Sequence, residues 1–243
     1  MNVFFTFNHT AIHSYLLKYL RNYQRMKHIT IKNTDQQIPV GKMVCVGRNY
    51  SEHVKELGNK VPEKPVVFLK PNSSLIFSGD KIIYPTFSNE MHHEVELVLL
   101  IGKEIKNANP GKAEDAIEAY GVGLDMTLRD LQTKLKEKGH PWTIAKGFDT
   151  SAVVSDFISK REYTLTLDEK IILSVNGVKR QDDLLNKMIF SPAEIVEYLS
   201  SLMTLNKGDI IFTGTPKGVS KVNKGDKIFA QISGIAELSC EVE

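Results

Sequence analysis

The chain has 243 residues, of which 42% are hydrophobic and 25% are charged, a mixture typical of a globular protein with a sizeable core. Its 31 basic and 29 acidic residues leave a formal net charge of +2, which gives no reason to expect a nucleic-acid or anionic-membrane partner. No window approaches the roughly 18 apolar residues that a membrane helix needs.

Residues 1–40 are expected to form an N-terminal extension that includes a small strand–turn element. No acidic residue precedes Asp35 and basic residues are frequent, so residues 1–25 resemble a transit peptide in composition. We favour a short appended or packing helix here, and a stretch that adds little is a further interpretation. We therefore expect a cytoplasmic protein, or a mitochondrial one if residues 1–25 are a transit peptide.

The segment 28–47 has the pattern strand, turn, strand, because Ile29 and Ile31 alternate with polar residues. Hydrophobic spacing then predicts four elements in chain order: a helix at 49–58 closed by a glycine, a strand at 66–69, a strand at 92–102 and a helix at 112–120. Cys45 and Cys240 lie in apolar surroundings, which predicts buried and reduced thiols.

The second half of the chain combines helices that have clear ends with strands that follow turns. A glycine-rich strand reaches Asp125, and a charged helix at 128–139 follows it and stops at a glycine. Another helix starts after Ser191, which suits a capping residue because a proline and then a glutamate follow it. The tetrapeptide NKGD stands before a predicted strand at 206–209 and again at 223–226. This order indicates an α+β protein without a linker between large domains.

Two acids, Glu94 and Glu96, stand at the start of the apolar strand predicted at 92–102. Residues i and i+2 of a strand face the same side, so the two carboxylates should project together. Asp125, at the end of another apolar strand, is either a third member of this group or the cap of the next helix. Three clustered carboxylates would suit Mg²⁺ or Mn²⁺, whereas Cys and His residues at zinc spacing are absent from the sequence.

Six motifs follow one another in the order and spacing of the fumarylacetoacetate hydrolase family: CVGRNYSEHVKELG, VVFLKPNSSL, HHEVELVLLIG, GLDMTLRDLQ, PWTIAKGFD and FTGTPKGV. Within that family, the chain most resembles the single-domain acylpyruvate hydrolase and oxaloacetate decarboxylase branch. The resemblance covers residues 41–243. It implies one catalytic domain with an α+β fold, a distorted β-roll of mixed β-sheets with short flanking helices. It also implies a homodimer and a Mg²⁺ or Mn²⁺ cofactor.

The resemblance also assigns expected roles to residues of the six motifs. The metal ligands are expected to be Glu94, Glu96 and Asp125. The expected catalytic residues are His53, Glu56 and Lys146. Contacts with the substrate are expected from Arg48, Lys70, Arg129, Gln132 and Thr215.

The chemistry expected from these residues is the formation of an enolate from a small 2-oxo or 2,4-dioxo acid. A metal ion bound to the carboxylate and the ketone would stabilise that enolate. Oxaloacetate decarboxylation and acylpyruvate hydrolysis both pass through it. Hydrolysis also needs an activated water, for which His53 and Glu56, three residues apart on a predicted helix, are suited.

Two other classes of function stay open. The same site could isomerise or decarboxylate diacids of the 2-hydroxyhepta-2,4-diene-1,7-dioate type, or tautomerise oxaloacetate. A metabolite-binding protein without turnover is the non-enzymatic alternative. The sequence does not determine the 2-oxo acid or the choice between Mg²⁺ and Mn²⁺.

Overall fold

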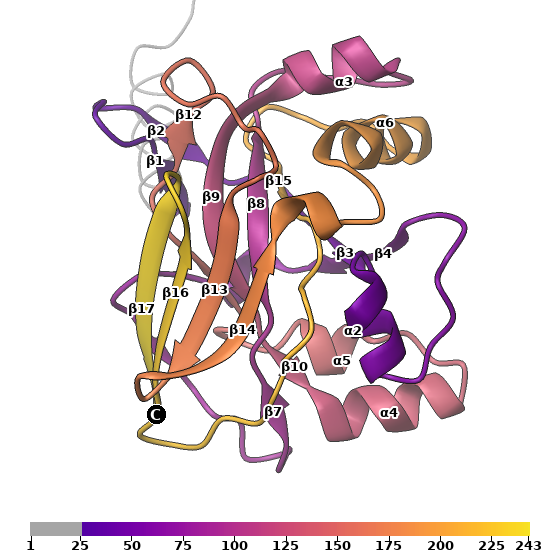
Figure 1. The fold of residues 1–243 in the computed structure, drawn as a ribbon, viewed down its shortest axis with the longest axis vertical. Helices are drawn as coiled ribbons and strands as arrows, with labels where there is room; N and C mark the ends of the chain where they lie inside the picture. Colours follow the sequence, from indigo (N-terminus) through magenta and orange to yellow (C-terminus); the bar gives the residue numbers. More distant parts are fainter. Residues whose placement is uncertain (1–25) are drawn as a thin grey trace, which may run out of the picture.

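The computed structural model describes residues 26–243, in which two β-sheets pack against each other and short helices lie at their ends (Figure 1). The larger sheet contains β3 (Met43–Gly47), β4 (Val66–Lys70), β5 (Leu75–Phe77), β8 (Val95–Ile101), β9 (Ile117–Asp125), β11 (Ala152–Val154), β12 (Ile158–Ser159) and β15 (Ile210–Phe212). The smaller sheet contains β6 (Lys81–Ile82), β13 (Lys170–Val175), β14 (Val178–Leu184), β16 (Lys227–Ile232) and β17 (Ala236–Val242).

Both sheets mix parallel and antiparallel pairs. The larger sheet has the order β4-β3-β15-β8-β9-β11-β5, with β12 on β9, and the smaller has the order β14-β13-β16-β17-β6. Two further pairs stand apart: β1 (His28–Thr30) with β2 (Gln37–Pro39), and β7 (Met91–His92) with β10 (Thr127–Leu128). The expected α+β class is confirmed, as is the turn before each NKGD strand, where the φ angles of Gly208 and Gly225 are 91° and 88°.

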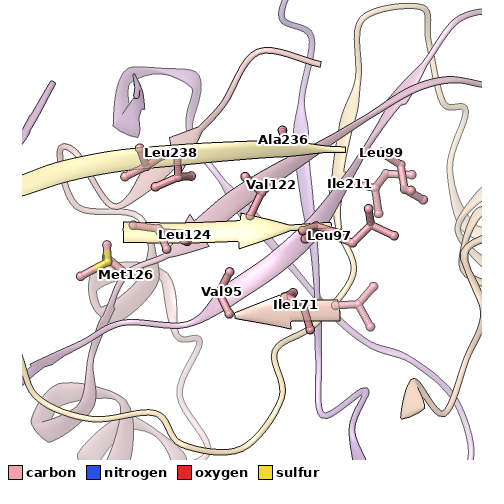
Figure 2. Close-up of a cluster of buried hydrophobic side chains, with 14 of the residues drawn as sticks. Val95, Leu97, Leu99, Val122, Leu124, Met126, Ile171, Ile211, Ala236 and Leu238 are labelled. Carbon is pink, nitrogen blue, oxygen red and sulfur yellow. The ribbon is translucent and has the colours of Figure 1, made fainter. Parts of the chain in front are cut away.

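The main core lies between the two sheets. Figure 2 shows Val95 and Leu97 of β8 beside Val122 of β9, with Ile171 and Leu238 of the smaller sheet facing them. A second buried cluster covers the other face of β8 under the β1–β2 pair. Because both faces of β8 are buried, its sequence is almost continuously apolar and does not alternate. Glu96, near the start of β8, and Glu94, just before it, therefore place carboxyl groups at one end of a dry sheet.

Within residues 26–243, five α-helices lie outside the sheets: α2 (Ser51–Glu56), α3 (Pro110–Ala116), α4 (Arg129–Glu137), α5 (Thr143–Lys146) and α6 (Pro192–Leu202). In Figure 1, α3 and α6 pack together at one end of the large sheet, and α2, α4 and α5 gather near its other end. The second group lies where β8 begins and β9 finishes. Three helices thus surround the edge at which the acidic residues stand.

The helix predicted at 112–120 is shorter than expected, since α3 ends at Ala116 and Ile117 already opens β9. Ile117 pairs with Ile101 of β8, and Tyr120 pairs with both Leu99 and Ile158. The β-branched and aromatic side chains of this stretch suit a strand, and ladder pairing on two sides outweighs their helical spacing.

The helix that follows Ser191 has the predicted cap. The Ser191 hydroxyl accepts a hydrogen bond from the Glu194 N–H, and the Glu194 carboxylate accepts one from the Ser191 N–H at 2.7 Å.

The expectations on residues 1–25 fall outside the described residues. Cys45 and Cys240 are buried and unpaired, as predicted. Within residues 26–243, no helix is long and apolar enough to cross a membrane.

Replacing Ser191 with alanine is expected to lower the free energy of unfolding by about 1 kcal/mol at neutral pH. Hydrogen bonds from the Ser191 hydroxyl and N–H lower the pKa of Glu194, so this carboxylate stabilises the fold above its ordinary pKa and less so as pH falls through the lowered value. The difference in free energy of unfolding between wild type and Ser191→Ala should therefore become smaller below about pH 4. Urea unfolding at both pH values tests this, and equal stabilities at neutral pH would contradict it.

Candidate active site

Most of the predicted site residues line one small cavity at the end of the large sheet where β8 begins and β9 ends. Its volume is ≈ 40 Å³, enough for a few water molecules. Nine of the eleven predicted residues line it: Arg48, His53, Glu94, Glu96, Asp125, Arg129, Gln132, Lys146 and Thr215. The other two, Glu56 and Lys70, lie behind this lining and contact His53 and Asp125 respectively.

The three carboxylates form a compact buried group. One oxygen of each of Glu94, Glu96 and Asp125 lies within 4.8 Å of the others, and the three residues are 5%, 2% and 1% exposed. Asp125 is not a helix cap, because Leu128 occupies that position before α4. Glu94 does not belong to the strand as expected, since β8 begins at Val95.

The break before β8 has a local cause. The His93 N–H bonds to the carbonyl of Ser220, which draws the chain out of the ladder, yet the Glu94 carbonyl still accepts the Asp125 N–H at 2.9 Å. The two strand ends thus stay joined at the level of the carboxylates. Glu94 and Glu96 reach the same cavity without sharing a regular strand.

Cations surround two of the three carboxylates. The Lys146 ammonium donates to Glu94 at 2.8 Å and to Asp125 at 2.6 Å, and Arg129 forms an ion pair with Glu94. Burial would raise the pKa of Glu94, but Lys146 and Arg129 hold it well below its usual range. Burial would lower the pKa of Lys146, and Asp125 and Glu94 raise it above the ordinary value. Both groups are thus kept charged.

Glu96 is different, because its carboxylate forms no ion pair within residues 26–243 and accepts only the Gly214 N–H, at 2.7 Å. Burial, and then the charges of Asp125 and Glu94, raise its pKa well above the ordinary value. Glu96 therefore lacks the positive charge that lysine and arginine side chains bring to Glu94 and Asp125. A hard divalent cation with oxygen ligands would supply that charge, so the residues present fit a Mg²⁺ or Mn²⁺ ion.

Lys70 supports the carboxylate group from beneath. Its ammonium is fully buried, lies 2.8 Å from Asp125 and donates to the backbone carbonyls of Met126, Lys146 and Ser151. These contacts hold the end of β9 against α5 and fix the position of Asp125. Protein atoms take up its donors, so the expected contact between Lys70 and substrate stays a prediction.

His53 and Glu56 form the expected pair on α2. The Nδ1 atom of His53 lies 3.0 Å from a Glu56 carboxylate oxygen. The other Glu56 oxygen accepts the Gly218 N–H at 3.0 Å, which ties α2 to the loop 213–218. Burial raises the pKa of Glu56, but hydrogen bonds from His53 and Gly218 bring it below normal. With its Nδ1 proton donated to Glu56, His53 has a lone pair on Nε2 that is available to the cavity.

The remaining predicted residues reach the cavity from different elements of the fold. Arg129 donates to Gln132 at 2.5 Å on the same face of α4, and Arg48 follows β3 with an unusual φ of 63°. Thr215 belongs to the loop after β15, in which Gly214 has a φ of 101°. A side chain on Gly214 would also meet Asn49 at 2.6 Å, so only glycine suits this approach to Glu96.

Gln181 is a buried residue that sequence reasoning missed. Its oxygen accepts from His93 Nδ1 and from the Val95 N–H, while its amide donates to the Thr215 hydroxyl and the Pro216 carbonyl. Since this donation occupies a lone pair of Thr215, the hydroxyl proton stays free to donate into the cavity. In the sequence, Gln181 follows Arg180 within an ordinary strand, and this pattern does not indicate a role in the site. Only the fold brings β14 to the start of β8.

Comparison with known proteins agrees with the fold. The family model described as fumarylacetoacetate (FAA) hydrolase C-terminal matches residues 42–243. A mitochondrial oxaloacetate tautomerase of Arabidopsis thaliana is 46% identical over 202 residues, 83% of this chain and 91% of that protein. An oxaloacetate tautomerase of Escherichia coli is 43% identical over 197 residues, 81% of this chain and 90% of that protein.

A solved structure is similar over nearly the whole described chain. The crystal structure of fumarylpyruvate hydrolase from Pseudomonas aeruginosa in complex with Mn²⁺ and pyruvate matches with a TM-score of 0.86 and 38% identity. The match covers 89% of this chain and 95% of that chain. The expected family and its β-roll of mixed sheets are thereby confirmed.

Proposed function

The chain belongs to the fumarylacetoacetate hydrolase family, and from this premise we propose that it is a divalent-metal-dependent oxaloacetate tautomerase. One observation carries the proposal. A carboxylate group suited to a metal ion, a paired histidine base and a buried ammonium line the same small cavity. Relatives that are 46% and 43% identical over most of this chain are oxaloacetate tautomerases.

The reaction moves one proton. The keto and enol forms of oxaloacetate differ in whether a proton is on C3 or on the C2 oxygen, and the enolate lies between them. Glu94, Glu96 and Asp125 would hold the Mg²⁺ or Mn²⁺ ion, which when bound supplies Lewis-acid polarisation of the 2-oxo group.

The chain's own residues supply the rest of the chemistry. In ketonisation, His53 Nε2 takes the proton from the C2 oxygen of the enol and delivers it to C3, and the reverse transfer forms the enol. Glu56 orients the ring and stabilises its positive charge while His53 carries the proton. Lys146 keeps Glu94 ionised in its buried setting and also forms an ion pair with Asp125. Arg129 and the Thr215 hydroxyl provide donors for the oxygens of the substrate.

Acylpyruvate hydrolysis is the second candidate, and the His53–Glu56 pair favours it. A histidine base held by a carboxylate can deprotonate water as well as carbon. The similar structure from Pseudomonas aeruginosa is that of a fumarylpyruvate hydrolase. Decarboxylation of oxaloacetate would pass through the same kind of enolate, so its rate should be measured together with those of the other two reactions.

A three-reaction assay tests the proposal. The purified protein is given enol-oxaloacetate, acetylpyruvate and keto-oxaloacetate, each with Mg²⁺, with Mn²⁺ and with EDTA. We expect ketonisation to be the fastest of the three reactions and EDTA to abolish it. Pyruvate release from acetylpyruvate as the dominant reaction would favour the hydrolase. No acceleration of any reaction would support a binding protein, and full activity in EDTA would contradict the metal site.

A further inference from the structure

Two cations of the cavity are not neutralised by an acid. Lys146 and Arg129 pair with the carboxylate group, but neither Arg48 nor Lys136 forms an ion pair among the described residues. Arg48 makes no hydrogen bond there either, and Lys136 has one, to Asn59 at 3.3 Å. Burial, and then the charges of Arg48 and Arg129, lower the pKa of Lys136. Positive charge has thus accumulated on this side of the cavity.

Asn59 adds an unused donor at the same place. A lysine ammonium can only donate, so its contact with Asn59 fixes the amide with its oxygen toward Lys136. The Asn59 Nδ2 atom is buried and has no hydrogen-bond partner within residues 26–243. Buried donors are seldom left unpaired, and the residue lines the cavity. Ammonium, guanidinium and amide together offer donors only.

The position of this group follows from the helix that carries Lys136. Arg129, Gln132 and Lys136 are spaced three and four apart, so they lie along one face of α4, and all three line the cavity. Arg129 contacts the metal-ligand candidate Glu94. Lys136 stands seven residues on, roughly 10 Å further along the helix axis. The donors therefore lie beyond the carboxylate group, where the distal end of a substrate would reach.

We infer that Lys136, Arg48 and Asn59 form a subsite for a second carboxylate, which makes the enzyme selective for 2-oxo diacids over 2-oxo acids with an uncharged tail. The inference rests on the proposed function, because it assumes that the 2-oxo acid end lies against Glu94, Glu96 and Asp125. A dianion satisfies two otherwise unpaired cations and an unpaired amide donor. A methyl group in the same place leaves all three unsatisfied.

Equilibrium binding to the intact protein in Mg²⁺ tests the subsite. Trp142 is the only tryptophan of the chain and lines the cavity, so its fluorescence reports occupancy without turnover. The two probes are oxaloacetate and 2-oxobutyrate, which has a methyl group where oxaloacetate has its second carboxylate. We expect wild type to bind oxaloacetate at least about tenfold more tightly than 2-oxobutyrate, which is the difference that a charged hydrogen bond contributes.

The variant Lys136→Met should weaken oxaloacetate binding about tenfold and leave 2-oxobutyrate within about twofold. Lys136→Arg should restore most of the loss because it keeps the charge. Lys134→Met is the matched control, since this lysine is exposed on the same helix, and it should bind both acids like wild type.

Each other outcome overturns a defined claim. Equal weakening of both acids by Lys136→Met, or no weakening of either, would overturn the subsite while the 2-oxo acid site stands. Equal affinity of wild type for the two acids would do the same. If neither acid binds in Mg²⁺, the proposed function and the subsite fall together. If oxaloacetate binds with the expected preference but no tautomerisation is seen, only the proposed reaction fails.

Discussion

Replacing Glu96 with glutamine is expected to abolish metal binding and reduce catalysis by about two to three powers of ten. Lewis-acid stabilisation by a bound ion contributes several kcal/mol to a transition state, and each 1.4 kcal/mol is a factor of ten in rate. Glutamine preserves the size of the side chain, and its oxygen can still accept the Gly214 N–H. The change therefore removes a charge and leaves the packing of β8 in place.

Without a bound metal ion, the same replacement should leave the thermal stability of the protein unchanged or raise it. Glu96 is buried beside two other carboxylates, which raise its pKa, so its negative charge disfavours the folded state when no cation is bound. In EDTA, Glu96→Gln should unfold at the same temperature as wild type or at a higher one. A concentration of Mg²⁺ or Mn²⁺ a hundredfold above the Kd should stabilise wild type by about 2.7 kcal/mol, or roughly 5–10 °C. The variant should show no such shift.

Thermal unfolding with and without metal therefore separates a lost ligand from a lost fold. Glu104→Gln is the matched control, because this glutamate is exposed outside the site, and it should behave like wild type in both measurements. Metal-dependent activity or a metal-induced shift in Glu96→Gln would show that Glu96 is not a ligand. Lower stability of the variant in EDTA would contradict the electrostatic argument.

Local chemistry made much of this fold predictable. The capping box at Ser191, the helix ahead of Gly139 and the turns before the NKGD strands rest on interactions within a few residues, and all are present. The predicted end of the helix at 112–120 was wrong because Ile117 pairs with β8, a strand from another part of the chain. Helical spacing describes one segment alone, whereas ladder pairing depends on the whole sheet.

The same distinction applies to the site. The sequence could place Glu94, Glu96 and Asp125 at the ends of apolar strands, and the structure brings them within 4.8 Å. It could not show that Gln181 joins three separate segments around Thr215, because that contact spans 34 residues. Lys70 is a similar case, since its backbone partners lie 56 to 81 residues away. Buried polar networks depend on tertiary contacts that leave no periodic trace.

Replacing His53 with alanine is the second change with a large expected effect. Removing a general base typically reduces the rate by two to four powers of ten, and we expect about this loss in the ketonisation of enol-oxaloacetate. Binding of Mg²⁺ and of oxaloacetate should change little, because His53 contacts neither Glu96 nor Asp125 by hydrogen bond or ion pair. Most of the loss should therefore appear in kcat.

Glu56 provides the test of whether the pair acts as a unit. Glu56→Gln should cost less than His53→Ala, since the amide can still accept the Nδ1 proton but stabilises a charged ring poorly. In the His53→Ala background the same change should cost almost nothing further, because Glu56 acts through the ring. Additive losses in the double variant would instead mean that Glu56 works through its Gly218 contact with the loop that carries Thr215. Full activity of a folded, metal-binding His53→Ala protein would place the proton transfer elsewhere in the cavity.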